Sequence, residues 1–185
     1  KAYYIAREGR PGPVWLDIPL EMQAAEVEEA ELRHFEKSGY SSEYVSKLET
    51  DDIEEVYELL KNAKRPVVLG GQGIRLSKAV EEFETFLGHF DIPAVFSRMG
   101  KDSLLATSKY YLGAIGNHGN RTGNITLQNA DVLLVLGSRL GINAVGYSYD
   151  LFAREAKVIV VDIDKNEHSK NTVHIEKLIQ SDIRA

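Results

Sequence analysis

Helical and strand-like patterns of apolar residues alternate along the chain from residue 41 onward. The first helix is amphipathic, because apolar residues recur at helical spacing in Ile53, Val56, Leu59 and Leu60. Asp51 or Asp52 is placed to be its N-cap. Further helices are expected at 77–90, 121–130 and 147–156, with a loop, a short helix and a turn between 97 and 120.

Short apolar runs between these helices predict the strands. They lie within 65–73, 92–96, 131–140 and 157–164, with a weaker one in 174–182. Continuous runs such as "DVLLVL" and "KVIVV" are typical of parallel strands buried on both faces. Strands alternating with helices imply βαβ crossovers. The expected fold class is therefore α/β: a three-layer Rossmann-like domain with a mostly parallel sheet of about six strands, of the deoxyhypusine-synthase-like NAD/FAD-binding type.

The first forty residues follow a different pattern. Residues 1–8 read as the last turns of a helix, with Gly9 where a helix C-terminus usually places glycine. "PVWLDIP", residues 13–19, predicts a short strand, and the Glu-rich stretch 21–40 has no clear periodicity. The beginning of this chain thus reads like the end of another domain, followed by a linker.

Composition narrows the class of protein. The 185 residues are 43% apolar, enough for one sizeable core, and the net charge is −6. Without a basic block, nucleic acid is not an expected partner. With no cysteine, disulfides and thiolate zinc sites are excluded, which fits the cytoplasm. No apolar run reaches membrane-spanning length, so we expect no membrane partner. The first residue is Lys1, which suggests a piece cut from a longer chain.

Candidate binding residues lie after the apolar runs, because ligands of open parallel sheets bind beyond the carboxyl ends of the strands. Glycine turns stand at 70–73, 113–119 and 137–139, and carboxylates stand in 162–164 and 181–182. Glycines at such turns let backbone N–H groups approach a phosphate, and carboxylates can accept hydrogen bonds from a ribose. Together these segments outline a nucleotide crevice.

Each of these residues also has a plainer interpretation. The glycines can serve turns with positive φ, Arg139 can pair with a local carboxylate instead of a phosphate, and Asp162 and Asp164 can cap loops. His118 can contact a ligand or bond its own loop. Leu76 replaces the third glycine of a dinucleotide fingerprint and the expected acid is missing, which disfavours an ordinary NAD dehydrogenase.

No catalytic or metal-binding constellation is recognisable. The other histidines have no partners at metal-ligand spacing and are interpreted as surface or helix-end residues: His34, His89, His168 and His174. No serine lies in a nucleophile elbow and no paired carboxylates suggest acid–base chemistry. We therefore expect no catalytic residue and no metal ligand in this chain.

The order of the motifs carries more information than any one of them. "GRPGPVWLDIP", "AKRPVVLGGQG", "LGAIGNHGN", "ADVLLVLGSRL", "KVIVVDID" and "IQSD" follow each other as in the large subunit of acetolactate synthase, which the chain resembles over nearly its whole length. The resemblance is to a thiamine-diphosphate-dependent family whose subunits have a pyrimidine-binding, a central and a diphosphate-binding domain. It implies that residues 1–22 close the pyrimidine-binding domain, 23–40 form a linker and 41–185 form the central Rossmann-like domain.

The resemblance also implies which residues lie at a cofactor crevice, since some central domains of the family hold FAD or an ADP-like nucleotide. The matching positions are Gly71, Gly73, Gly116, His118, Gly137, Ser138, Arg139, Asp162, Asp164 and Asp182. FAD-holding members resemble R-F-D-D-R where this chain has "RLGIN", residues 139–143. The loss of those charged residues argues against a bound FAD.

The resemblance further implies where the thiamine chemistry lies. The family's activating glutamate belongs to the pyrimidine-binding domain, and its G-D-G…N motif, which holds Mg²⁺ and the diphosphate, belongs to the third domain. We expect neither in residues 1–185, so that thiamine diphosphate and Mg²⁺ serve the parent and are not bound by this fragment. Its expected partners are the other two domains and, in the parent, further copies of the subunit.

Three functions remain open from the sequence. The first is a mainly structural central domain of an acetolactate synthase-like transferase or lyase, which decarboxylates a 2-keto acid and joins the product to a second carbonyl compound. The second is a stand-alone nucleotide- or flavin-binding module. An NAD-dependent enzyme on a sirtuin-like sheet is the third, for which no catalytic residue can be named.

Overall fold

The apolar runs pair into one six-stranded sheet in the computed structural model, which describes residues 1–39, 44 and 46–185. Every strand pair is parallel, and the strand order is β3-β2-β1-β4-β5-β6. The strands are β1 Pro66–Gly70, β2 Ala94–Phe96, β3 Tyr111–Ala114, β4 Val132–Leu136, β5 Lys157–Asp162 and β6 Lys177–Gln180. The predicted parallel, Rossmann-like α/β fold is confirmed.

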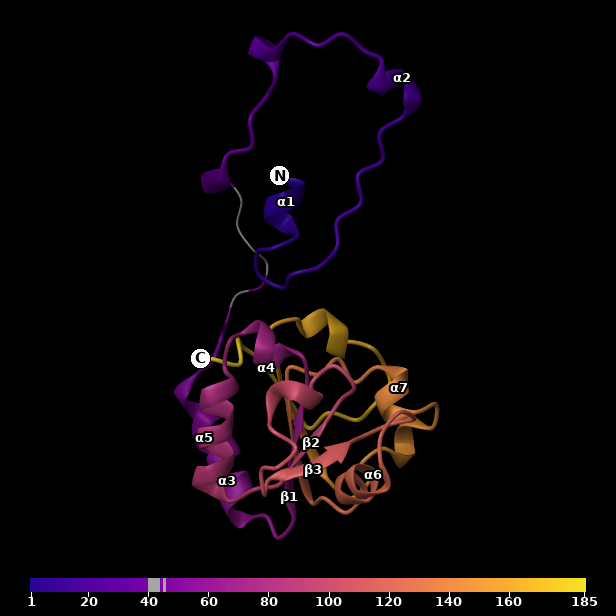
Figure 1. Ribbon diagram of the computed structural model, residues 1–185. Coiled ribbons are helices and arrows are strands. Elements are labelled where there is room, and N and C mark those ends of the chain that lie inside the picture. The colour runs from indigo at the N-terminus through magenta and orange to yellow at the C-terminus, as the bar shows by residue number, and fades with distance from the viewer. Residues whose placement is uncertain (40–43, 45) are drawn as a thin grey trace. The chain divides into compact units, whose positions relative to one another are not determined.

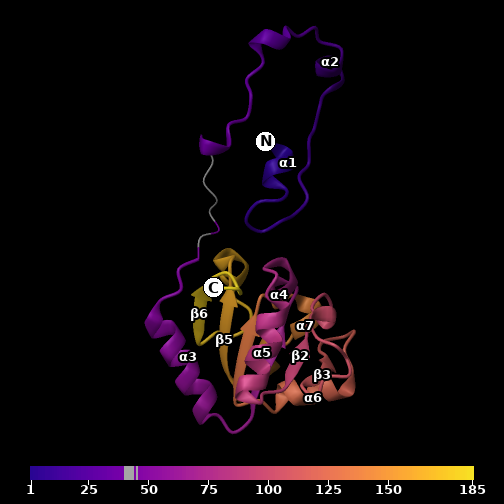
Figure 2. The ribbon, with the colours of Figure 1, turned by 60° about the vertical axis from the view of Figure 1, so that its left-hand side comes forward.

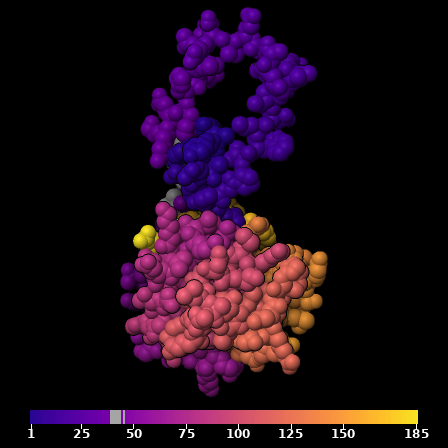
Figure 3. Space-filling view, viewed as in Figure 1, coloured from indigo at the N-terminus to yellow at the C-terminus, as the bar shows by residue number. Residues whose placement is uncertain are grey.

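Helices cover both faces of this sheet. They are α3 Thr50–Asn62, α4 Gly73–Leu76, α5 Val80–Phe90, α6 Arg121–Gln128 and α7 Ile142–Val145, with 3₁₀ turns η3 Lys101–Ser103, η4 Tyr149–Leu151 and η5 Lys165–His168. Figures 1 and 2 show α3 and α5 together on one side and α6 and α7 on the other. In the space-filling view of Figure 3, side chains fill the spaces that separate the ribbons in Figure 1.

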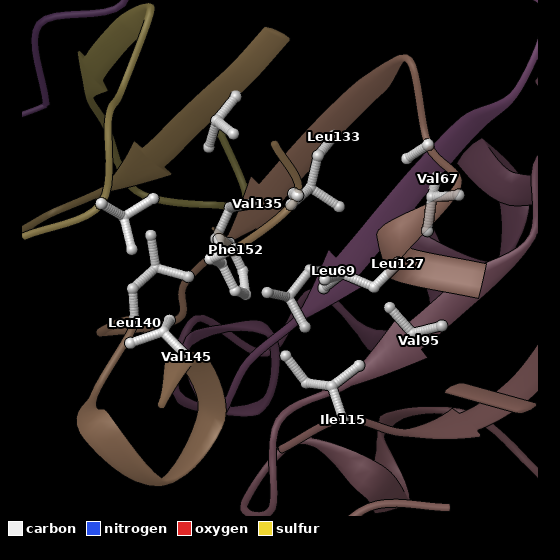
Figure 4. Packing of buried hydrophobic residues seen from close by; sticks show 14 of the residues in the cluster. Val67, Leu69, Val95, Ile115, Leu127, Leu133, Val135, Leu140, Val145 and Phe152 are labelled. Carbon is white, nitrogen blue, oxygen red and sulfur yellow. The ribbon is translucent and has the colours of Figure 1, made fainter. Parts of the chain in front are cut away.

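Successive side chains of each strand point to opposite faces of the sheet and so belong to two separate hydrophobic cores. Val67 and Leu69 of β1 belong to a core that includes Leu127 of α6, Val145 of α7 and Phe152 (Figure 4). Val68, between them, belongs to the opposite core, with Leu60 of α3 and Phe83 and Leu87 of α5. Since successive strand residues point to opposite faces, one uninterrupted apolar run supplies both cores.

Some local predictions were wrong. Residues 111–114, predicted as part of a loop and turn, form edge strand β3. This strand is irregular: its pairing with β2 shifts by one residue, and Gly113 has a φ of +109°. The helix expected at 147–156 is reduced to the 3₁₀ turn η4, and α7 precedes it. The N-cap of α3 is Glu49 rather than an aspartate, and the carboxylate of Asp52 accepts the Glu49 backbone N–H at 3.3 Å.

The chain divides into the compact units Lys1–Tyr44 and Val45–Ala185. The first contains α1 Ala2–Ile5, α2 Leu20–Gln23 and the 3₁₀ turns η1 Glu29–Glu31 and η2 Lys37–Gly39. Among its described residues there is no strand, so the strand predicted at 13–19 is wrong, and this segment runs as an irregular trace (Figure 2). A strand requires a neighbouring backbone to pair with. Trp15, in the middle of the segment, is 90% exposed.

Candidate functional site

The candidate site lies at the carboxyl ends of β1 and β4, the two neighbouring strands from which the strand order runs in opposite directions. From β1 the chain proceeds outward through β2 to β3, and from β4 it proceeds the other way through β5 to β6. The loops after β1 and β4 therefore diverge to opposite faces and leave a crevice between them, which is the usual ligand position in such sheets. A cavity of about 560 Å³ lies here. This volume is within the range of small-molecule sites.

The glycine turn after β1 packs against the loop after β4. The N–H of Gly71 donates to the Leu136 carbonyl at 2.9 Å, and the N–H of Gly73 donates to the Gly137 carbonyl at 3.0 Å. A Cβ on Gly73 would lie 2.5 Å from the Cα of Gly137, and one on Gly71 would collide with the Gly137 carbonyl. The approach of two backbones thus explains these glycines, and Gly71 and Gly73 do not line the cavity.

The second glycine loop, after β3, is also locked by its own chain. Gly116 has a φ of +84°, and a Cβ there would collide with the Asn143 carbonyl. Its N–H donates to Asn124 Oδ1 at 2.8 Å, while the N–H of Asn117 donates to the Asn143 carbonyl at 3.0 Å. His118 of this loop lines the cavity. Gly116 does not line it, and is explained by the positive φ and the close backbone contact of the turn.

Three predicted residues line the cavity from the loop after β4: Gly137, Ser138 and Arg139. The guanidinium of Arg139 turns to Glu167 of η5, with Nε to Oε2 at 2.8 Å and Nη2 to Oε1 at 3.2 Å. Lys170, which also lines the cavity, donates to the same Oε2 at 2.6 Å. Of the two interpretations left open for Arg139, the structure contains the local carboxylate pair.

The carboxyl of Glu167 is strongly held in its charged form. Its side chain is only 17% exposed, whereas those of Arg139 and Lys170 are 64% and 49% exposed. Burial alone raises the pKa of this carboxyl, but the hydrogen bonds and charges of Lys170 and Arg139 outweigh burial and lower the pKa to about 2. Glu167 is thus a carboxylate set behind two cations that face the cavity.

The aspartates after β5 do not reach the cavity. Asp162 and Asp164 are both buried; the Asp162 carboxylate accepts the Asp164 N–H at 2.9 Å, and the Asp164 carboxylate accepts the Asn166 N–H at 3.0 Å. These bonds are the loop-capping alternative. His168 ends η5, as expected of a helix-end histidine, but its side chain is 1% exposed and Nε2 lies 3.3 Å from Asp162 Oδ2.

Asp182 lies elsewhere. Its carboxylate accepts the Arg184 N–H at 2.8 Å, and it lines a separate, largely apolar cavity of about 420 Å³ between α3 and α5. Sequence reasoning brought ten residues to one crevice, whereas four of them line the cavity: His118, Gly137, Ser138 and Arg139. The functional role of the ten stays a prediction.

Sequence reasoning overlooked Arg98 and Lys170, two cations that line the same cavity. Arg98 follows β2, whose strand was predicted, whereas Lys170 follows the 3₁₀ turn η5, which was not predicted. Arg98 could have been found from its position just after the end of β2. Lys170 could not be found in this way, because it lies several residues after the end of β5. Within residues 1–39, 44 and 46–185 no group of three histidine, cysteine or acidic side chains could hold a metal ion.

Comparison with known proteins gives one consistent family. The family model "Thiamine pyrophosphate enzyme, central domain" matches residues 53–185. The acetolactate synthase large subunit of Lactococcus lactis is 34% identical over all of this chain and 32% of its own length. The isozyme 2 large subunit of Escherichia coli is 30% identical over 100% of this chain and 32% of its own length.

A further relative is the acetolactate synthase of Mycobacterium bovis, 32% identical over all of this chain and 29% of its own length. The chain therefore spans about a third of the length of the curated relatives it matches. No helix in the described part of the chain is long and apolar enough to cross a membrane. The family match covers the whole sheet and both cores, and on this evidence the chain belongs to the central-domain family of thiamine pyrophosphate enzymes.

Proposed function

We propose that this chain supplies the central domain, and the closing segment of the pyrimidine-binding domain, of an enzyme similar to the acetolactate synthase large subunit. The observation that carries the proposal is the coincidence of the family match, 53–185, with the compact unit Val45–Ala185. Residues 1–22 would then close the preceding domain, 23–40 link the two, and 41–185 form the central domain. The relatives match residues 1–44 together with the rest of the chain, which supports placing both segments in one parent subunit.

The parent enzyme would decarboxylate a 2-keto acid and join the remaining fragment to a second carbonyl compound, with thiamine diphosphate supplying the electron sink. The residues of this chain do not fit the Mg²⁺-bound diphosphate of that cofactor. Mg²⁺ in such sites is held by carboxylate and carbonyl oxygens, and no acidic cluster of this kind occurs in the described residues. No step of the reaction is therefore assigned to this chain.

The proposed role of the domain is mechanical. Two cores on one sheet give a stiff body, able to hold the flanking cofactor-binding domains at a fixed separation. We also propose that the parent assembles from several copies. The alternative of a stand-alone nucleotide or flavin module is not favoured by the comparisons, since the relatives are synthase subunits matched over the full chain.

An activity assay tests this proposal. The purified 185-residue chain, supplied with pyruvate, thiamine diphosphate and Mg²⁺, is expected to form no acetolactate and to bind no thiamine diphosphate by calorimetry. The intact acetolactate synthase of Lactococcus lactis, assayed in the same buffer, is the positive control. Turnover by the chain alone would overturn a purely structural role.

A further inference from the structure

The crevice contains two features that usually hold phosphate, and both are engaged by the chain itself. The first is the glycine turn after β1. Its Gly71 N–H donates to the carbonyl of Leu136, the last residue of β4, at 2.9 Å, and its Gly73 N–H donates to the carbonyl of Gly137, in the loop after β4, at 3.0 Å. A phosphate cradle needs such groups free and pointing at the ligand. The backbone of Gly137 lies against this turn instead.

The second feature is the pair of cations Arg139 and Lys170. Both line the cavity, yet Arg139 uses one edge of its guanidinium on both oxygens of Glu167, and Lys170 lies 2.6 Å from one of them. A forked guanidinium–carboxylate pair has the same geometry as a guanidinium–phosphate pair, so Glu167 takes the position of an anionic group. Glu167 itself does not line the cavity.

The mostly buried position of Glu167 makes this engagement persistent. A carboxylate that is 17% exposed is poorly hydrated where it lies, so the contacts with Arg139 and Lys170 compensate its charge. A phosphate entering the crevice would have to displace Glu167 from Arg139 and leave that carboxylate with less compensation. The competition is within one molecule and is therefore present at all times.

We propose that Glu167 determines the ligand specificity of this crevice, by acting as an internal counter-anion that rejects phosphate groups. An FAD or ADP-like nucleotide, which the family implies for some members, does not fit the crevice in this state. Arg98 also lines the cavity, so loss of the Glu167 charge leaves three cations around one space. The inference concerns contacts inside the Val45–Ala185 unit and does not depend on the reaction of the parent.

The test compares phosphate binding before and after the charge is removed. Inorganic pyrophosphate is titrated into the full chain and into Glu167→Gln, a nearly isosteric change, by isothermal calorimetry at low salt. We expect Glu167→Gln to bind pyrophosphate at least about tenfold more tightly than the unmodified chain, because charge-assisted hydrogen bonds to Arg139 and Lys170 become available. Adding Arg139→Met to this variant should abolish the gain.

Glu155→Gln is the matched control, because Glu155 is exposed, outside the cavity lining, and its loss changes the net charge equally. It should leave pyrophosphate binding unchanged. Equal affinity of Glu167→Gln and the unmodified chain would overturn the proposal, and weaker binding would do so too, because Glu167 would then be orienting Arg139 for a ligand. If Glu167→Gln does not fold, Glu167→Asp decides: the shorter carboxylate reaches the cations less well, and an affinity no higher than that of the unmodified chain overturns the proposal.

Discussion

Asp131 Oδ1 accepts the backbone N–H of Arg65 at 2.9 Å, which ties the residue before β4 to the residue before β1. Its other oxygen accepts the N–H of Lys64 at 2.8 Å. The two central strands of the sheet are thus held at their amino ends by one side chain. Burial raises the pKa of this carboxyl, but the hydrogen bonds from Arg65 and Lys64 outweigh it and the pKa is lowered.

The first prediction follows from this pair. Asp131→Ala removes two hydrogen bonds to a charged carboxylate, so the free energy of unfolding should fall by about 1–3 kcal/mol in urea titrations. Asp150→Ala, at an exposed aspartate, is the control and should change it by less than about 0.5 kcal/mol. A change of the same size in both variants would show that the two hydrogen bonds contribute nothing specific.

The second prediction concerns pH. The pKa of Glu167 is lowered from 4.5 to about 2, so the ionised carboxylate stabilises the fold fully above pH 4.5, and this contribution disappears as the pH falls toward 2. Exposure of Arg139 and Lys170 limits the contribution to on the order of 1–2 kcal/mol. Unfolding titrations of the chain and of Glu167→Gln should therefore differ at pH 7 and converge near pH 2. A pH-independent difference would contradict the ion-pair explanation.

The third prediction concerns the contact between glycines. Gly73→Ala places a methyl group 2.5 Å from the Cα of Gly137, and neither backbone can retreat without breaking the Gly73–Gly137 hydrogen bond. We expect a loss of at least about 2 kcal/mol in unfolding free energy. Gly141→Ala is the matched control in the same crevice, since nothing lies within 4 Å of its added Cβ and its φ is −70°. Similar stability of both variants would refute the close-approach argument.

The fourth prediction concerns the two units. Deleting residues 1–40 should leave a cooperatively folding protein, because both cores are built from residues beyond Val45. Circular dichroism is the measurement, since the single tryptophan, Trp15, lies in the deleted segment and is already 90% exposed. A melting temperature within a few degrees of that of the full chain is expected. A molten product without a cooperative transition would mean that residues 1–40 complete the core.

The sheet could be predicted from the sequence because its central strands contain uninterrupted apolar runs, as in residues 132–136 and 158–161. Such runs have few other stable arrangements. Edge strand β3 escaped prediction because Tyr111, Leu112, Gly113 and Ala114 contain no β-branched residue, and a short edge strand depends on its neighbour rather than on its own propensity.

The crevice could be located from strand ends, but its internal pairing could not be predicted. That Arg139 pairs with a carboxylate was one of two open alternatives, and which carboxylate depends on how the chain after β5 folds back. Glu167 lies 28 residues further along in a short 3₁₀ turn, whose direction no local pattern specifies. Likewise, the glycines indicated that this turn could approach a phosphate, whereas the group that lies against Gly71 and Gly73 is the backbone of Gly137.

The glycine contact between the loops after β1 and β4 has a consequence for how the sheet unfolds. β1, β2 and β3 form one half of the sheet and β4, β5 and β6 the other, joined by the pairing of β1 with β4. Hydrogen bonds to Asp131 hold the β1–β4 junction at the amino ends of these strands, and the hydrogen bonds of Gly71 and Gly73 hold it at the carboxyl ends. Separating the two halves breaks both sets of hydrogen bonds. Amide protons of the two halves should therefore exchange with solvent through the same global opening.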